Sequence, residues 1–155
     1  MARLLKVFLV FLTLGCSGMR ARSSTERDSR NILFTEVDKA ELMDAFKQVF
    51  TNDSFAVASN ADSKPAWMKA NMEKLEKGSP FPKHYFRPGL SYEIWAHFIP
   101  DKDRRFTVRL SIQRIEHLQL GGERGEEIRD DTYYRGTITK VMRELNKKGW
   151  KGTAN

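Results

Sequence analysis

The chain has 155 residues and a formal net charge of +7, with 40% hydrophobic and 30% charged residues. This length fits one domain, and the balance of apolar and charged residues is typical of a folded protein and argues against intrinsic disorder. The single cysteine excludes an intramolecular disulfide, and no apolar run reaches the roughly 18 residues of an ordinary membrane-spanning helix.

The start of the chain has the pattern of an export signal. Arg3 and Lys6 are basic, and the segment 7–14 is mostly apolar. This apolar segment is too short to anchor the chain across a bilayer, so residues 1–15 are expected to be a signal peptide that takes no part in the fold. Cleavage removes Arg3 and Lys6 and lowers the formal net charge from +7 to +5.

The only cysteine, Cys16, directly follows this apolar segment. Thr13-Leu14-Gly15-Cys16 resembles the lipobox of bacterial lipoproteins, although Thr13 replaces the usual leucine and Leu14 replaces the usual small residue. The resemblance is confined to the signal region. It implies that the Cys16 sulfur carries a diacylglyceryl group, that the chain is cut before Cys16, and that the new amino group is acylated.

Several acyl chains give stable membrane attachment, whereas one chain gives only marginal binding. Ser17 implies, by the same resemblance, sorting to the outer membrane of a Gram-negative cell, facing the periplasm. The alternative is an ordinary secretory signal, after which the protein is released. Residues 16–31 are small, polar and charged, and are expected to form the lipidated N-terminus and a flexible tether.

The folded domain is expected to span residues 32–150, followed by a tail at 151–155. Asp38 and Glu41 have the spacing of a capping box, and apolar residues then recur at helical intervals. This pattern predicts a helix from about residue 37 to residue 50. The short apolar segment 55–58 predicts a strand.

A second helix is predicted from about residue 63 to Gly78, with Pro65 in its first turn, where a missing N–H does no harm. Its buried stripe would consist of Trp67, Met68, Met72 and Leu75. The proline-rich segment 79–91 predicts an irregular loop at the edge of the fold.

Segments 92–99 and 105–115 alternate apolar and polar residues, which predicts an antiparallel hairpin with a polar turn at 100–104 and one buried face. Matching the apolar faces pairs Phe98 with Phe106, Ala96 with Val108 and Ile94 with Leu110. The alternation breaks near Gln113-Arg114, which predicts a bulge before the strand continues through Leu118 and Leu120.

The acidic, glycine-rich segment 121–131 predicts a loop. A last helix is predicted from about Asp131 to Lys148, with Asp130 or Asp131 as its cap, Gly149 at its end and Trp150 folded back on its last turn. These elements describe an α+β domain, with about three helices packed on one face of a small antiparallel or mixed sheet.

No catalytic or metal-binding motif is recognisable. His84, His97 and His117 lack zinc-site spacing, and no serine lies near an evident activating base. The domain is therefore expected to be non-enzymatic and to need no cofactor or metal. The alternative is an exported enzyme whose catalytic groups meet only in the fold, with His97 and Glu93 as candidates.

The hairpin face opposite the core is the predicted partner surface. It carries Trp95, His97 and Arg109, and the expected register places Trp95 across from Arg109 in a geometry suited to a cation–π contact. The alternative is that a helix or the 79–91 loop covers Trp95. A second candidate surface is that loop itself, where aromatic and basic residues alternate at Lys83, Tyr85 and Arg87; alternatively, the aromatic side chains of the loop anchor it in the core.

Lysines and arginines are spread along the whole chain without a nucleic-acid-binding motif, so nucleic acid is not an expected partner. A positively charged domain at the cell envelope is expected to meet an envelope protein or an anionic glycan or lipid. The sequence therefore predicts a membrane-anchored envelope lipoprotein that binds such a partner.

Overall fold

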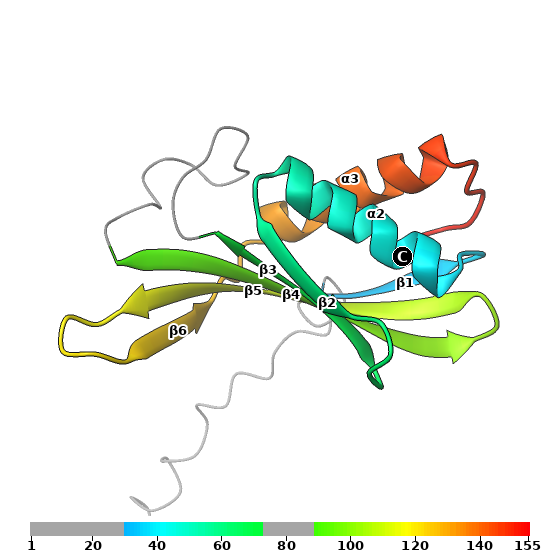
Figure 1. Ribbon diagram of the computed structural model, residues 1–155. Helices are drawn as coiled ribbons and strands as arrows, with labels where there is room; N and C mark the ends of the chain where they lie inside the picture. Colours follow the sequence, from blue (N-terminus) through cyan, green and yellow to red (C-terminus); the bar gives the residue numbers. More distant parts are fainter. Residues whose placement is uncertain (1–29, 73–88) are drawn as a thin grey trace, which may run out of the picture.

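The computed structural model of the protein describes residues 30–72 and 89–155 (Figure 1). Its elements are β1 (Asn31–Thr35), α2 (Lys39–Asn52), β2 (Ala56–Asn60), β3 (Ala66–Met72), β4 (Leu90–Lys102), β5 (Arg105–His117), β6 (Glu123–Glu127) and α3 (Asp131–Lys147). The strands form one antiparallel six-stranded sheet in the order β1-β5-β4-β3-β2, and β6 also pairs with β5.

Both helices lie side by side on one face of this sheet (Figure 1). The α+β class is confirmed, but the described residues contain two helices instead of the expected three. The sheet face opposite the helices, which we call the open face, carries no helix from the described part of the chain. This arrangement determines which side chains are available for binding.

The core forms because alternate side chains of each strand point toward the helices. The buried apolar residues of β3 and β4 on this face are Ala66, Met68, Ala70, Met72, Tyr92, Ile94, Ala96 and Phe98. From α2, Phe46 meets the ring of Phe98 edge-on, with a centroid distance of 5.3 Å.

Both long helices begin at the predicted caps. Asp38 and Glu41 form the capping box of α2, and the Thr132 N–H donates to the Asp130 carboxylate at 2.9 Å at the start of α3. This hydrogen bond lowers the pKa of Asp130. Trp150 was expected on the last turn of α3, but its ring contacts β1: the indole N–H donates to the Thr35 carbonyl at 2.8 Å, and the ring centroid lies 6.1 Å from that of Phe34.

The predicted second helix is wrong where it can be compared, because residues 66–72 form the strand β3. Met68 and Met72 face the core, while Trp67 and Lys69 face the other side of the sheet. The continuation of that helix past residue 72 and most of the predicted loop 79–91 lie outside the described residues.

The hairpin of β4 and β5 is confirmed, but its predicted register is wrong by two residues. Phe98 lies opposite Val108, and Trp95 lies opposite Ser111. The reason is that the turn lies further along the chain: β4 extends to Lys102, β5 begins at Arg105, and Asp103-Arg104 forms the connection, with Arg104 at a φ of 56°. The irregularity in pairing falls between Pro100 and Lys102, and no bulge interrupts the pairing at Gln113-Arg114.

The segment expected as an acidic loop contains a short strand, β6, which pairs with the end of β5. The alternation breaks near residue 114 because Arg114 forms an ion pair with Glu126 of β6 instead of entering the core. Leu118 and Leu120 do not continue a buried strand; they lie in the turn before β6 and are 47% and 102% exposed.

One edge of β5 is shared by two strands. β1 pairs with residues 105–109, β6 pairs with residues 113–117, and Ile112 lies between them. The Ile112 N–H donates to the Tyr134 hydroxyl at 3.1 Å, and that hydroxyl donates to the Ile128 carbonyl at 2.8 Å. Burial raises the pKa of Tyr134, an effect partly opposed by its hydrogen bond with Ile112 and the charge of Arg30.

Residues 151–155, expected as a tail, approach the outer side of β1. Leu33 and Asn155 exchange two backbone hydrogen bonds, of 2.8 and 3.1 Å, and the Thr35 N–H donates to the Thr153 carbonyl at 3.0 Å. β1 is therefore hydrogen-bonded on both sides, to β5 and to the C-terminal residues.

Candidate functional site

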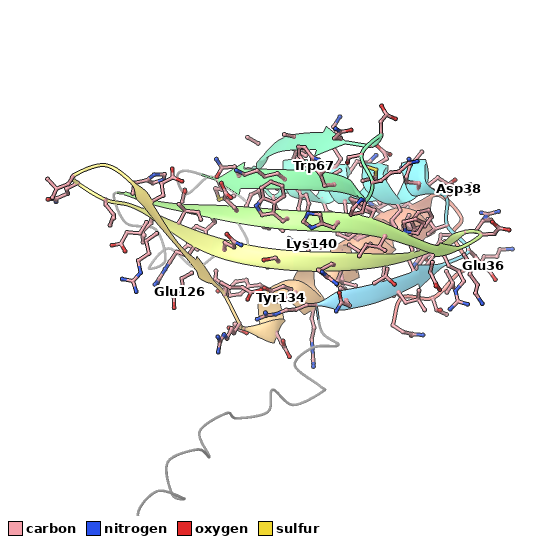
Figure 2. All side chains as sticks on the ribbon, turned by 90° about the horizontal axis from the view of Figure 1, so that it is seen from below. Glu36, Asp38, Trp67, Glu126, Tyr134 and Lys140 are labelled. Carbon is pink, nitrogen blue, oxygen red and sulfur yellow. The ribbon has the colours of Figure 1, made fainter. Side chains whose placement is uncertain are left out.

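Three rings form a row on the open face, which we call the aromatic strip: Trp67 of β3, and Trp95 and His97 of β4. The ring centroids of Trp67 and Trp95 are 5.7 Å apart, and those of Trp95 and His97 are 6.0 Å apart with nearly parallel planes. All three side chains are half-buried. Figure 2 looks onto this face and labels Trp67. The strip exists because strand alternation sends these side chains away from the helices.

Glu93 and Lys69 hold Trp95 in place. The Lys69 ammonium is 2.5 Å from one Glu93 oxygen, and the indole N–H of Trp95 donates to the other oxygen at 3.2 Å. The same ammonium lies 5.2 Å from the centre of the Trp95 ring. Trp95 therefore makes a cation–π contact, but with Lys69 and not with the expected Arg109.

Arg109 shares this face, as predicted, and lies directly opposite His97. Its Nε donates to the Asn31 side-chain oxygen at 3.2 Å. Asn31 is neutral, so this contact orients the exposed guanidinium without neutralising it. The open face thus presents a positive charge beside the aromatic strip.

Sequence reasoning missed Trp67 and Lys69 because it placed both on a helix. The signal that would have found them is the period-2 pattern of segment 66–72, in which apolar Ala and Met alternate with Trp, Lys and Asn. The other predicted site residues, Lys83, Tyr85 and Arg87, lie outside the described residues.

The two candidates for the enzyme alternative, Glu93 and His97, do not act on each other in the structure. The Glu93 carboxylate is bonded to Lys69 and Trp95, while the imidazole of His97 stacks on the Trp95 ring. These contacts build a surface, and they do not form an acid–base pair.

A second polar cluster lies at the end of the open face where β4 begins. The Ser91 hydroxyl is 3.1 Å from Nε2 of His117, and Nδ1 of His117 is 3.3 Å from a Glu123 carboxylate oxygen. Ser91 is only 3% exposed, whereas His117 and Glu123 are exposed. No sequence pattern predicted this cluster, because Glu123 was expected in a loop. The observed register pairs Ser91 with Ile115, which makes His117 the diagonal neighbour of Ser91 on the same face.

Within residues 30–72 and 89–155, no cluster of three or more histidine, cysteine, aspartate or glutamate side chains is suited to holding a metal ion. No helix in these same two ranges is long and apolar enough to cross a bilayer. Comparison of the chain with protein-family models, with curated proteins and with solved structures gave no significant match.

Proposed function

We propose that the chain is a lipid-anchored protein of the bacterial envelope that binds an anionic glycan through its open face. The observation that carries the proposal is the aromatic strip, together with the basic groups beside it. Flat aromatic rings offer a large apolar contact area, onto which the C–H faces of sugar rings stack, and neighbouring polar groups reach the hydroxyls.

The strip is suited to binding because it is held in place before any partner arrives. Its rings project from paired strands, and Glu93 bonds both Lys69 and Trp95. A partner therefore does not have to order these side chains, which reduces the entropy lost on binding. The rings follow a sheet surface, and this shape favours an extended polymer over a small enclosed ligand.

The charge of the site favours an anionic partner. Arg109 is exposed and contacts the neutral Asn31, and loss of Arg3 and Lys6 leaves the chain with a formal net charge of +5. Acidic groups on a glycan complement this charge and speed association. Binding is therefore expected to weaken as salt is added.

The anchor is proposed from the resemblance at Cys16, which lies outside the described residues. Radiolabelled palmitate is expected to enter the wild-type chain expressed in a Gram-negative cell, and not Cys16→Ala. Mass spectrometry of the labelled chain is expected to find acyl groups on residue 16 as the new N-terminus. An unmodified Cys16, or a different N-terminus, would contradict the anchor and leave a released protein.

Glycan binding is tested with the full chain purified in detergent, using peptidoglycan sacculi and bead-bound lipopolysaccharide as probes. Trp95→Ala is expected to weaken retention on at least one probe about tenfold, which corresponds to about 1.4 kcal/mol, because a stacked ring is lost. Arg135→Ala is the matched control, since Arg135 is exposed on α3.

Equal retention of wild type, Trp95→Ala and Arg135→Ala would contradict the role of the open face. Failure of wild type to bind either probe would contradict the glycan. Crosslinking from position 95 to an envelope protein would replace the glycan by a protein partner. Enhanced retention at low salt, lost in Arg109→Ala, is expected from the charge of that residue.

A further inference from the structure

We propose that Ser91, His117 and Glu123 form a nucleophilic site that hydrolyses carboxylic esters. The contacts have the order that such a site needs: the serine hydroxyl meets Nε2 of the imidazole at 3.1 Å, and Nδ1 meets a carboxylate at 3.3 Å. A serine, a histidine and an acid in this order activate the hydroxyl on several unrelated folds.

Backbone pairing positions all three side chains. Ser91 and His117 lie on adjacent strands, and the His117 N–H donates to the Gly89 carbonyl at 2.7 Å. A tight turn then returns the chain, with Gly121 and Gly122 at φ values of 87° and 97°, and places Glu123 directly opposite His117. Groups fixed by sheet pairing hold a reactive geometry better than groups on a free loop.

The burial of the cluster suits this role. Ser91 is 3% exposed, which shields its hydrogen bond to His117 from competing water. His117 and Glu123 are exposed, and a polar contact between exposed side chains adds little to stability, so the fold gains little from their alignment. A surface hollow of about 630 Å³ lies beside the cluster and is lined by Gly89, Leu90 and His117, which leaves space for an acyl group next to the imidazole.

The reaction balances with water as the only co-reactant. The Ser91 oxygen attacks the ester carbonyl carbon while Nε2 of His117 accepts the hydroxyl proton. The C–O bond to the alcohol breaks, and the alcohol leaves with that proton. Water, deprotonated by His117, then attacks the acyl-serine and releases a carboxylic acid and free Ser91. Glu123 acts as a positioning residue that holds the imidazole with its Nδ1 proton toward the carboxylate.

The place of the cluster indicates the kind of ester. Ser91 and Trp95 point to the same side of β4, and four residues of strand separate their Cα atoms by about 13 Å. An acyl ester carried on a sugar of the bound glycan therefore lies within reach of Ser91. This choice of substrate rests on the proposed glycan binding, whereas the nucleophilic site itself does not.

The experiment treats the full chain in detergent with a biotin-linked fluorophosphonate, whose phosphorus bonds to an activated serine with loss of fluoride. Peptide mapping is expected to find the label on Ser91 in wild type and in Ser111→Ala, a serine of β5 on the same face, and to find none in Ser91→Ala or His117→Ala. No label on folded wild type, or a label on another residue, would overturn the proposal.

Hydrolysis of p-nitrophenyl acetate gives the second readout. Ser91→Ala is expected to lower the rate at least a hundredfold, to the buffer rate, and Glu123→Gln to lower kcat about tenfold with KM unchanged. A Ser91→Ala rate equal to wild type would overturn the proposal. Neither reagent contains a sugar, so loss of glycan binding and loss of this reactivity are separate results.

Discussion

Replacing Tyr134 with phenylalanine removes a single oxygen from the part of the β5 edge that neither β1 nor β6 covers. The hydroxyl oxygen accepts from the Ile112 N–H, and the O–H group donates to the Ile128 carbonyl. Tyr134 is 1% exposed and Ile112 is fully buried, so water cannot readily replace the lost contact at Ile112. Tyr134→Phe therefore tests whether this hydroxyl stabilises the edge of β5 between the part paired with β1 and the part paired with β6.

The expected loss of unfolding free energy follows from the two backbone groups. A buried polar group left without a partner costs about 1–3 kcal/mol. Leaving the Ile112 N–H without its partner is expected to cost unfolding free energy in the middle of this range. Leaving the partly exposed Ile128 carbonyl without its donor is expected to cost an amount near the bottom of the range, which gives about 2–4 kcal/mol in total. For a domain of this size, the melting temperature is expected to fall by about 8–16 °C.

Urea unfolding followed by tryptophan fluorescence measures this loss, and an unchanged m-value would show that the unfolding transition is the same. Tyr133→Phe is the control, because Tyr133 is the neighbouring tyrosine and is only partly buried. A loss below about 0.5 kcal/mol for Tyr134→Phe would refute the reasoning, since surface substitutions commonly produce changes of that size.

Three further results are expected. Burial raises the pKa of Tyr134 above 10.0, so above that pH the folded state keeps a proton that the unfolded state loses, and stability is expected to fall as the pH rises past 10. Urea unfolding midpoints measure this fall, and a fall of equal size in Tyr134→Phe would contradict it. Lys140 and Asp53 form an ion pair, so Lys140→Met leaves the Asp53 carboxylate, 12% exposed, without its partner and is expected to cost about 2–3 kcal/mol in thermal unfolding. Asp53→Asn is expected to cost less, because the Lys140 side chain that it leaves unpaired is 40% exposed; the reverse order would contradict the burial argument. In Gly152→Ala, the alanine Cβ would lie 1.9 Å from the Thr35 carbonyl oxygen, so residues 153–155 are expected to detach from β1 and the melting temperature to fall by several degrees. Hydrogen exchange at the Leu33 amide as slow as in wild type would contradict this prediction.

The parts of the fold that sequence reasoning predicted are those with both a period and a boundary signal. α2 has the Asp38–Glu41 capping box and α3 has Asp130 at its start and Gly149 at its end. The open face was assigned to the correct residues of β4 and β5 even though the register was wrong by two. A shift of two residues preserves the facing of every side chain, because the strand period is two.

The parts that were missed depend on tertiary contacts. Segment 66–72 consists largely of alanine, methionine and lysine, which favour helix in isolation, and only pairing with β4 makes it a strand. β6 contains no apolar side chain and is held by backbone pairing and by contacts such as the Arg114–Glu126 ion pair. Hydrophobic periodicity gives no signal for such a strand.

The candidate site was predicted only in part, because strand alternation was recognised in β4 and β5 but not in segment 66–72. Trp95, His97 and Arg109 were assigned to one face from alternation alone, whereas Lys69 and Trp67 came from the misread segment. The contact between Ser91 and His117 depends on where the turn between β4 and β5 lies, because a register shift of two residues changes which side chains are neighbours.

If the chain is anchored at Cys16 as proposed, the double pairing of β1 has a mechanical consequence. A pull transmitted through residue 30 reaches the domain at the first residue of β1, which is hydrogen-bonded to β5 on one side and to residues 153–155 on the other. Force along the strand loads these bonds together in shear, so they resist rupture collectively. Residues 153–155 would thereby brace the point at which tension from such an anchor enters the domain.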